Sequence, residues 1–328
     1  MKNDKAPIGA HPKSKEMVRM SWSRIVFAAV FALVSRGIWA AEGVNFGGPI
    51  GGTDIQNAYL PSQAGFYGAY IGGFGRGTTF YGNNGKENPN VSGGMTSGLQ
   101  ALGLLYVYPV TAFGGTLGTS VMGQAAWGSV NVNGVQQHYK GFGDMYSDLL
   151  MWSRHLGPEA ATGFTVKLAY SMLFPVGKYN TTDLYTPGRN VYYYIPNAAV
   201  TYMTGPNFLG DGLELSAHFF LDIASRNNAD QYENGTVADI DVAISERIGR
   251  WQVGVAGYYA WQLSDDHRLG QVVAPDGNRF ESAAVGPVLS YDIPKWKSNI
   301  KLKVLVPVYT RNSLAATTAY FVLSKAFN

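Results

Sequence analysis

Cysteine is absent from the 328 residues of this chain, and Asp, Glu, Lys and Arg together make up only 14% of it. The first absence excludes a disulfide framework, a Cys-ligated metal and a thiol nucleophile. The second lies well below the roughly 25% of an average soluble protein. The net charge of +3 comes without a basic run or an acidic tail, so nothing indicates nucleic acid as a partner.

Long apolar runs are also absent after residue 40, where no stretch approaches the roughly 20 residues that a transmembrane helix needs. The chain is instead rich in glycine, with 41 residues, and in aromatic residues, which reach 13%. A disordered chain would have fewer aromatic residues and more charge. Gly, Tyr, Thr and Val favour strands over long helices, so the composition predicts an all-β protein.

The N-terminus has the layout of a secretory signal peptide. Basic residues up to Arg24 precede an apolar run of about ten residues, and small residues follow it up to Ala41. We expect the signal peptide to span 1–40 with cleavage after Ala40, or alternatively after Ala41. The other interpretation is an N-terminal membrane anchor, but a helix of this run would be too short to span a bilayer.

The segment 213–224 shows the clearest strand pattern. Its odd positions are all apolar, whereas its even positions include Glu214, Ser216, His218 and Asp222. Alternation with a period of two places these sets on opposite faces of one strand. Twelve residues also exceed the usual five or six of a globular strand and match the roughly 9–11 that cross a bilayer at a tilt.

Similar patterns recur along the chain and predict about twelve strands, within a range of 10–14. The other segments are 64–74, 99–109, 116–130, 142–155, 164–174, 190–204, 237–246, 251–263, 280–292, 300–308 and 314–327. The facing of the last one stays open, because Tyr320 and Val322 compete with Phe321, Leu323 and Phe327.

The predicted connections alternate in length. Short ones fall at 111–115, 156–160, 205–212, 248–250 and 293–297. Longer ones fall at 76–98, 131–141, 177–189, 226–235 and 264–278, with a short exception at 310–313. Short periplasmic turns and long external loops are typical of a transmembrane antiparallel β-barrel of the bacterial outer membrane. The alternative, a secreted soluble β-sandwich or propeller, is disfavoured by the low charge and the long apolar faces.

This fold predicts three parts: the signal peptide at 1–40, a short N-terminal segment or plug at 41–63, and the barrel at 64–328. The polar faces of its strands should line the lumen, where charges must be paired or hydrated. We expect mostly structural ion pairs there, and a subset of these residues could line a conduction path. The candidates are Asp144, Asp148, Lys167, Glu214, His218, Asp222, Asp239, Asp241, Lys301 and Lys303.

An enzyme of the outer-membrane lipase type is the alternative that these residues raise, through Ser216, His218 and Asp222. Residues four apart on a strand lie about 13 Å from one another, too far for a base and its orienting partner. We therefore predict no catalytic residue, no cofactor and no metal ligand. The segment 264–268, Ser-Asp-Asp-His-Arg, could bind a divalent cation or a lipopolysaccharide phosphate, but a solvated loop is the interpretation we favour.

Four segments in order resemble a known family. They are Gly143–Asp148 leading into Trp152, Phe174–Tyr179, Asn228–Gly235 and Gly257–Asp266. The chain is similar over most of its mature length to the outer-membrane family named after the MetA protein of the phenol meta-degradation pathway. This family is regarded as related in fold to the FadL-type transporters of hydrophobic compounds.

The resemblance implies a channel for passive uptake of small hydrophobic or aromatic compounds. FadL-type proteins have a sizeable N-terminal hatch, for which the segment 41–63 is short. The expected partners are outer-membrane lipid and lipopolysaccharide, the substrate and the barrel-assembly machinery, with the protein as a monomer. A purely structural barrel without a transport role is a further alternative.

Overall fold

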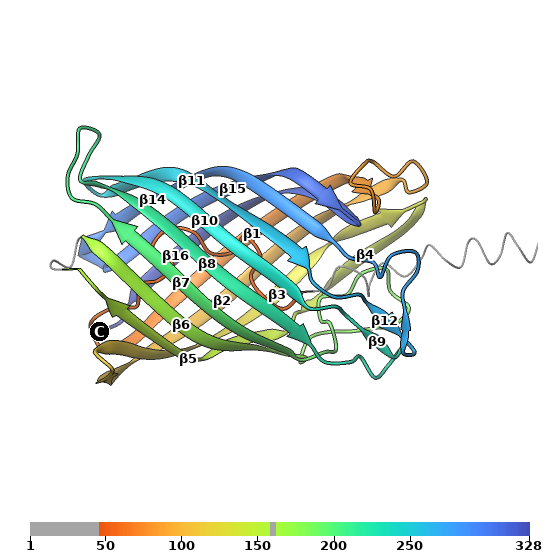
Figure 1. Cartoon of the computed structure of the whole chain (residues 1–328), viewed down its shortest axis with the longest axis horizontal. Coiled ribbons are helices and arrows are strands. Elements are labelled where there is room, and N and C mark those ends of the chain that lie inside the picture. The colour runs from red at the N-terminus through yellow and green to blue at the C-terminus, as the bar shows by residue number, and fades with distance from the viewer. Residues whose placement is uncertain (1–45, 158–161) are drawn as a thin grey trace, which may run out of the picture. The chain divides into compact units, whose positions relative to one another are not determined.

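The computed structural model describes residues 46–157 and 162–328, so the expected signal peptide and its cleavage site lie outside the described residues. Thirteen strands form one antiparallel sheet, drawn in Figure 1. They are β1 (Gly65–Tyr81), β2 (Gly93–Ala112), β3 (Gly115–Val132), β4 (Val135–Phe142), β5 (Met145–His155), β6 (Gly163–Phe174), β7 (Tyr193–Met203), β8 (Gly212–Ala224), β10 (Val237–Ile248), β11 (Trp251–Gln262), β14 (Glu281–Ile293), β15 (Ser298–Arg311) and β16 (Ser313–Ala326).

The remaining elements are small. Three two-residue strands, β9 (Tyr232–Glu233), β12 (His267–Arg268) and β13 (Gln271–Val272), pair with one another within the connections. A single 3-10 turn, η1 (Pro294–Trp296), joins β14 to β15. In the part of the chain that the structure describes, no helix is long and apolar enough to cross a membrane.

The large sheet closes into a barrel of twelve strands. β1 pairs with β16 along its whole length, from Tyr67 opposite Ala326 to Tyr81 opposite Ser313, and with β2 on its other side. β4 and β5 pair with successive parts of the same edge of β3, so together they make one strand of the barrel. The predicted fold and strand number are therefore confirmed.

The expectation of a long connection at 131–141 is wrong. β3 continues to Val132, Asn133 and Gly134 form a two-residue turn, and β4 returns from Val135. Both turn residues have positive φ, 51° and 86°, as a type I′ hairpin requires and as Asn-Gly tolerates. The connection expected at 76–98 likewise shrinks to 82–92, because β1 and β2 extend further than their apolar alternation.

The other connections keep the predicted asymmetry. Turns of two residues join β2 to β3 and β10 to β11, whereas the opposite end has long connections at 175–192, 225–236 and 263–280. We refer to these two ends as the turn end and the loop end. By the convention of outer-membrane barrels the turn end is periplasmic and the loop end external.

The two faces of each strand differ as the alternation predicted. On β8 the outward Leu215 and Phe219 are each 41% exposed, whereas the inward Glu214 and Asp222 are at most 1% exposed. On β16, Phe321 and Leu323 point outward, while Tyr320 and Val322 line an interior cavity. The structure thus shows which face of the last strand points inward, a question that the sequence left open. The outer surface is a belt of exposed apolar side chains, as lipid contact requires.

Two outward residues of β10 test which part of the strand lies in the hydrocarbon interior of the membrane. Val242 lies near the middle of the strand and Ile248 at its turn end, and both are exposed. Val242→Arg should lower the free energy of unfolding by about 2–4 kcal/mol, whereas Ile248→Arg should lower it by about 0–1 kcal/mol, because arginine is costly only in the hydrocarbon interior. Urea unfolding in vesicles measures both. Equal losses would mean that β10 does not cross the bilayer at this depth.

The absence of cysteine allows the two ends to be labelled separately. Asn83 lies in the connection after β1, and Phe208, 94% exposed, in the connection before β8. In intact cells, Asn83→Cys should react with a membrane-impermeant maleimide, and Phe208→Cys should react only after the envelope is opened. The cysteine-free parent protein is the control for background. The opposite labelling pattern would invert the assigned orientation.

Candidate functional site

Residues 46–64 run inside the barrel before β1 begins, which Figure 1 shows as the orange segment behind the front strands. Its first residue, Phe46, packs against Phe280, with ring centroids 6.0 Å apart. Near its other end, Leu60 lies within van der Waals reach of Gly118 on β3. We call residues 46–64 the lumenal segment.

Three predicted carboxylates hold the lumenal segment through its backbone. Asp222 accepts hydrogen bonds from the amides of Gly47 and Gly48, at 2.9 and 2.6 Å. Asp241 accepts from the amides of Gly51 and Thr53, at 2.7 and 2.8 Å, and from the Thr53 hydroxyl. Glu214 accepts from the amide of Gln56 at 2.5 Å. The wall therefore satisfies backbone donors that would otherwise be buried without partners.

Glycine is required where the segment meets the wall. A Cβ atom on Gly48 would lie 2.7 Å from a carboxylate oxygen of Asp222, and one on Gly47 would lie 2.4 Å from the side chain of Tyr193. Both distances are shorter than real Cβ contacts. The Gly-rich sequence of the segment thus lets its backbone approach closely enough to hydrogen-bond the carboxylates.

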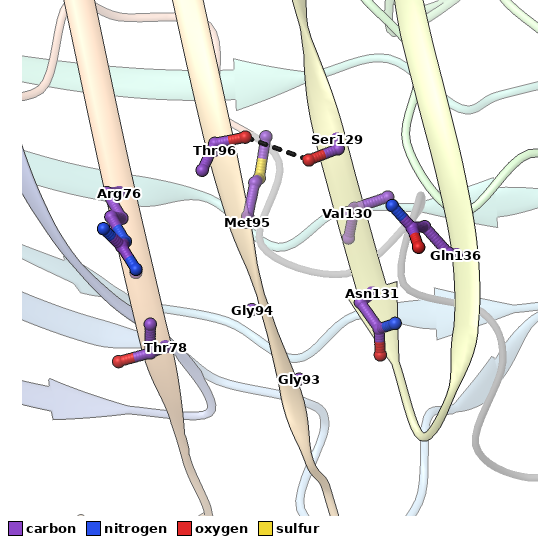
Figure 2. A pocket seen from close by; sticks show the side chains of 11 residues that line it. Arg76, Thr78, Gly93, Gly94, Met95, Thr96, Ser129, Val130, Asn131 and Gln136 are labelled. Carbon is purple, nitrogen blue, oxygen red and sulfur yellow. Dashed lines mark hydrogen bonds between the residues drawn. The ribbon is translucent and has the colours of Figure 1, made fainter.

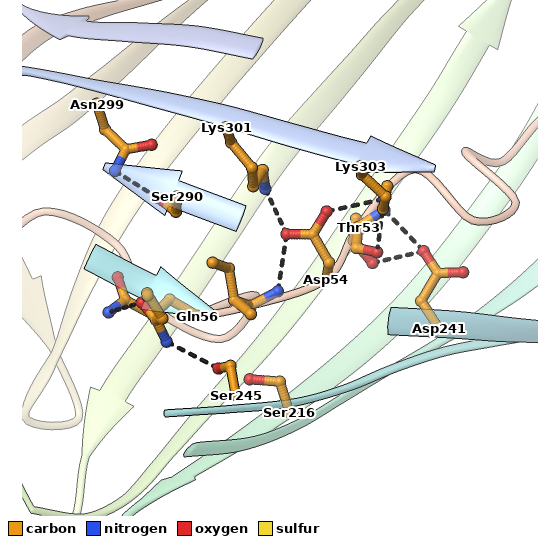
Figure 3. A network of polar contacts seen from close by, with 12 residues as sticks. Thr53, Asp54, Gln56, Ser216, Asp241, Ser245, Ser290, Asn299, Lys301 and Lys303 are labelled. Carbon is orange, nitrogen blue, oxygen red and sulfur yellow. Dashed lines mark hydrogen bonds and ion pairs between the residues drawn. The ribbon is translucent and has the colours of Figure 1, made fainter. Parts of the chain in front are cut away.

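An ion-pair cluster fixes the middle of the segment. Asp54, completely buried, pairs with Lys303 at 2.7 Å and with Lys301. Lys303 also donates to the carbonyl oxygens of Gly51 and Thr53. Figure 3 shows the two lysines of β15 converging on Asp54, with Asp241 on the far side of Thr53. Breaking such a buried pair leaves an uncompensated charge, so the cluster locks the segment to β15.

A cavity of about 240 Å³ lies beside the segment, and the two lysine anchors of β15 form part of its lining. The hydrogen-bonding carboxylates come from β8 and β10, and the two lysines from β15. Apolar and aromatic side chains of β1, β2, β3, β5, β6 and β16 line the cavity. These side chains are Ile71, Leu99, Met122, Tyr146, Leu173, Tyr320 and Val322.

The remaining predicted lumen residues have separate surroundings. Asp148 accepts from Ser120 and Ser171, and Asp144 accepts from the amides of Gly177 and Arg189. Lys167 on β6 is half-buried and forms no ion pair within residues 46–157 and 162–328. Asp239 is buried, and neither of its carboxylate oxygens is hydrogen-bonded within the same residues. We expected these acids to form ion pairs with Lys167, Lys301 or Lys303. In the structure they instead accept hydrogen bonds mainly from backbone amides and hydroxyl groups.

The three residues that suggested a hydrolase are bonded elsewhere. Ser216 contacts Thr201 and donates to Glu214, at 2.8 and 2.7 Å. His218 Nε2 lies 2.9 Å from Asn197 Oδ1. Asp222 accepts from the lumenal segment. The structure thus does not bring these side chains together as a nucleophile, a base and its orienting partner. Within the described ranges, no group of three His, Asp or Glu side chains has the arrangement of a metal site.

The expectation of a solvated loop is wrong for Asp266. Its carboxylate is 1% exposed and accepts hydrogen bonds from the amide of Gly235 and from the Tyr232 hydroxyl, at 2.7 and 2.6 Å. Burial raises the pKa of the Asp266 carboxyl, and the hydrogen bonds from Gly235 and Tyr232 oppose that rise. Asp265 forms an ion pair with Arg279 at 2.5 Å. Asp266 therefore ties the connections 225–236 and 263–280 together, and Asp265 braces the second of them internally.

A second cavity, of about 210 Å³, lies toward the loop end over β1 to β4. Figure 2 shows Arg76 and Thr78 on one side and Asn131 and Gln136 on the other, with a hydrogen bond between Thr96 and Ser129. Its lining contains no aromatic side chain and only Met95 and Val130 as apolar side chains, unlike that of the cavity beside the lumenal segment. The apolar cavity is therefore the better candidate for binding a hydrophobic molecule.

With this geometry in hand, the chain can be compared with known proteins. A family model described as "Putative MetA-pathway of phenol degradation" matches residues 78–322. The chain belongs to this family. The resemblance seen in the sequence is thereby confirmed. A search of curated proteins found no match.

Solved structures show the same fold. The COG4313 outer membrane channel from Pseudomonas putida F1 is 14% identical, with a TM-score of 0.71 over 84% of this chain and 100% of that one. A Pseudomonas aeruginosa FadL homologue is 10% identical, with a TM-score of 0.39 over 87% of this chain and 98% of that one. Only the first score is high enough to bear on the architecture, and it supports the twelve-strand outer-membrane barrel.

Two site residues were not predicted from the sequence. Asp54 precedes the first strand, where alternation gives no information, and only its position after a Gly-rich run could have indicated a packed turn. Arg189 lies in the connection before β7 and still reaches the cavity. No periodic pattern covers a connection that folds inward, so the alternation could not find it.

The ion-pair cluster predicts a clear effect of charge removal. Asp54→Asn should destabilise the protein by about 3–5 kcal/mol, as expected when one partner of a buried pair is lost, because Lys303 stays buried with its charge. The midpoint of heat-induced unfolding on gels and urea unfolding both report the loss. Asp54→Asn combined with Lys303→Met removes both charges and should recover much of it. A double variant no more stable than the single one would contradict the cluster's assigned role.

Proposed function

We propose that this protein is a channel of the bacterial outer membrane that admits small hydrophobic or aromatic molecules by passive flow. The observation that carries the proposal is the apolar cavity within the closed barrel, bounded by the lumenal segment. A cavity of about 150 Å³ lined by apolar side chains binds benzene in another protein. At about 240 Å³, this one has room for a single substituted ring. The P. putida channel of the same fold and the family's connection with phenol degradation add support.

Passive flow needs a site that binds weakly enough to release its ligand. The cavity offers apolar contact on several strands. A hydrophobic molecule would leave water on entering it, and its gradient across the membrane would set the direction of flow. The route past the cavity depends on the lumenal segment, because that segment supplies one side of the cavity's lining.

The lumenal segment acts in this proposal as the short plug of the barrel. Its carboxylate and lysine anchors lie on β8, β10 and β15, with further hydrogen bonds to Ser153 of β5 and Thr201 of β7, and the apolar cavity remains open beside it. This division supports a plug that shapes a narrow path for small molecules. It also supports a boundary between plug and barrel near residue 64, where β1 begins.

The same fold supports the expected partners. The belt of exposed apolar side chains suits outer-membrane lipid and lipopolysaccharide, and a barrel of this class would be inserted by the barrel-assembly machinery. Pairing of β1 with β16 closes the barrel, so neither of these strands offers a free edge to another chain, which favours a monomer. We assign no enzymatic activity, since Ser216, His218 and Asp222 each serve a structural contact.

Filling the cavity tests the proposal directly. Leu99 of β2 lines the cavity, whereas Leu102 of the same strand points outward and is 69% exposed. Leu99→Trp should reduce uptake of benzamide into vesicles carrying the protein by about an order of magnitude, because the indole occupies the space that the ring needs. Leu102→Trp is the matched control and should leave uptake unchanged. Normal uptake by a correctly folded Leu99→Trp variant would show that the cavity is not on the path.

A further inference from the structure

The charges around the apolar cavity do not balance. Its lining includes three cations, Arg189, Lys301 and Lys303, but only one carboxylate, that of Asp54. Asp54 is engaged by both lysines. Arg189 forms no ion pair with any residue in 46–157 or 162–328. Arg189 therefore faces a mainly apolar cavity without a direct ion pair, although the buried carboxylates of Asp144 and Asp222 lie within electrostatic range of it.

The position of Arg189 is fixed by its backbone. Asp144 accepts hydrogen bonds from the amides of Gly177 and Arg189, at 2.9 and 2.7 Å, and so clamps both ends of the connection 177–189 to the wall. The Arg189 amide is used in this clamp, but its guanidinium is not. The guanidinium carbon lies 5.6 Å from the ring centre of Phe46, at the edge of the cavity.

The neighbouring groups leave the guanidinium available. Its Nε is buried and makes no hydrogen bond in the described part of the chain. The nearby carboxylates are those of Asp144 and Asp222, and each already accepts two backbone amides. A buried guanidinium nitrogen without a partner is costly, and a ligand that supplies an acceptor would relieve that cost.

We propose that the cavity selects single-ring aromatic compounds that carry a carboxylate, with the carboxylate bound by Arg189 and the ring in the apolar part. This inference rests on the proposed function and names the substrate class of the same site. Arginine binds a carboxylate through two parallel hydrogen bonds, which fixes the orientation of the ligand. The ring then lies toward the side chains of Leu99, Met122 and Tyr320, which supply apolar and aromatic contact.

Benzoate and benzamide separate the two proposals, because they share a ring and nearly the same shape but differ in charge. Uptake of each is measured in vesicles carrying the purified protein. The wild-type protein should take up benzoate in preference to benzamide. Arg189→Gln should reduce benzoate uptake by about tenfold, the loss expected for a hydrogen bond to a charged group, and should leave benzamide uptake unchanged.

Two further variants isolate the role of the guanidinium. Arg189→Lys keeps the positive charge but loses the paired donors, so its preference for benzoate should fall between those of wild type and Arg189→Gln. Arg226→Gln removes an exposed cation from an external connection, outside the cavity, and should leave both uptakes unchanged. Heat-modifiable migration on gels confirms that each variant contains a folded barrel.

The outcomes are distinguishable. Failure of both compounds to enter through the wild-type protein would overturn the channel function itself. Entry of both, with no preference for benzoate or with equal losses of the two in Arg189→Gln, would overturn only the assigned substrate class. An equal loss of benzoate uptake in Arg226→Gln would show that the charge acts from the surface and not from the cavity, which also overturns the assignment.

Discussion

Pairing of β1 with β16 is the constraint on which the rest of this structure depends. A sheet in a bilayer has no water to satisfy an open edge, so it must close. Closure at twelve strands creates an interior that lipid cannot fill. The interior must then be occupied by side chains, by water or by another part of the chain. Here the lumenal segment takes much of that space, and its hydrogen bonds to Asp222, Asp241 and Glu214 follow from the need to satisfy a buried backbone.

The low charge content of the chain follows from the large part of its surface that faces lipid. A lipid-facing surface excludes charges, so those that remain gather where they have partners. Lys301 and Lys303 of β15 alternate with apolar neighbours and thereby point inward to Asp54. The resulting cluster joins residues about 250 positions apart in sequence. The cluster therefore requires both the lumenal segment and β15 to be in their final positions.

Sequence reasoning succeeded where periodicity carries information. Strands crossing a bilayer must alternate over their full length, and the faces of β8, β10 and β11 could therefore be read correctly. It failed at Asn133-Gly134, a hairpin turn within a polar stretch that resembles a loop, because β4 after the turn lacks a continuous apolar face. It also expected ion pairs for the inward-facing acids, whereas Asp222, Asp241 and Glu214 bond to backbone amides. An alternating pattern shows which way a side chain points, yet contains nothing about which distant backbone amide will meet it.

The division of the lumen explains how one barrel can both hold a plug and leave room for a ligand. The carboxylates that bind the segment lie on β8 and β10, while the cavity draws its apolar lining from β1, β2, β3, β5, β6 and β16. If polar and apolar positions alternated evenly around the barrel, the segment would have no preferred side. Their separation places the segment's amides against carboxylates and leaves Arg189 facing the apolar side. The same asymmetry that fixes the segment thus sets the chemistry of the space beside it.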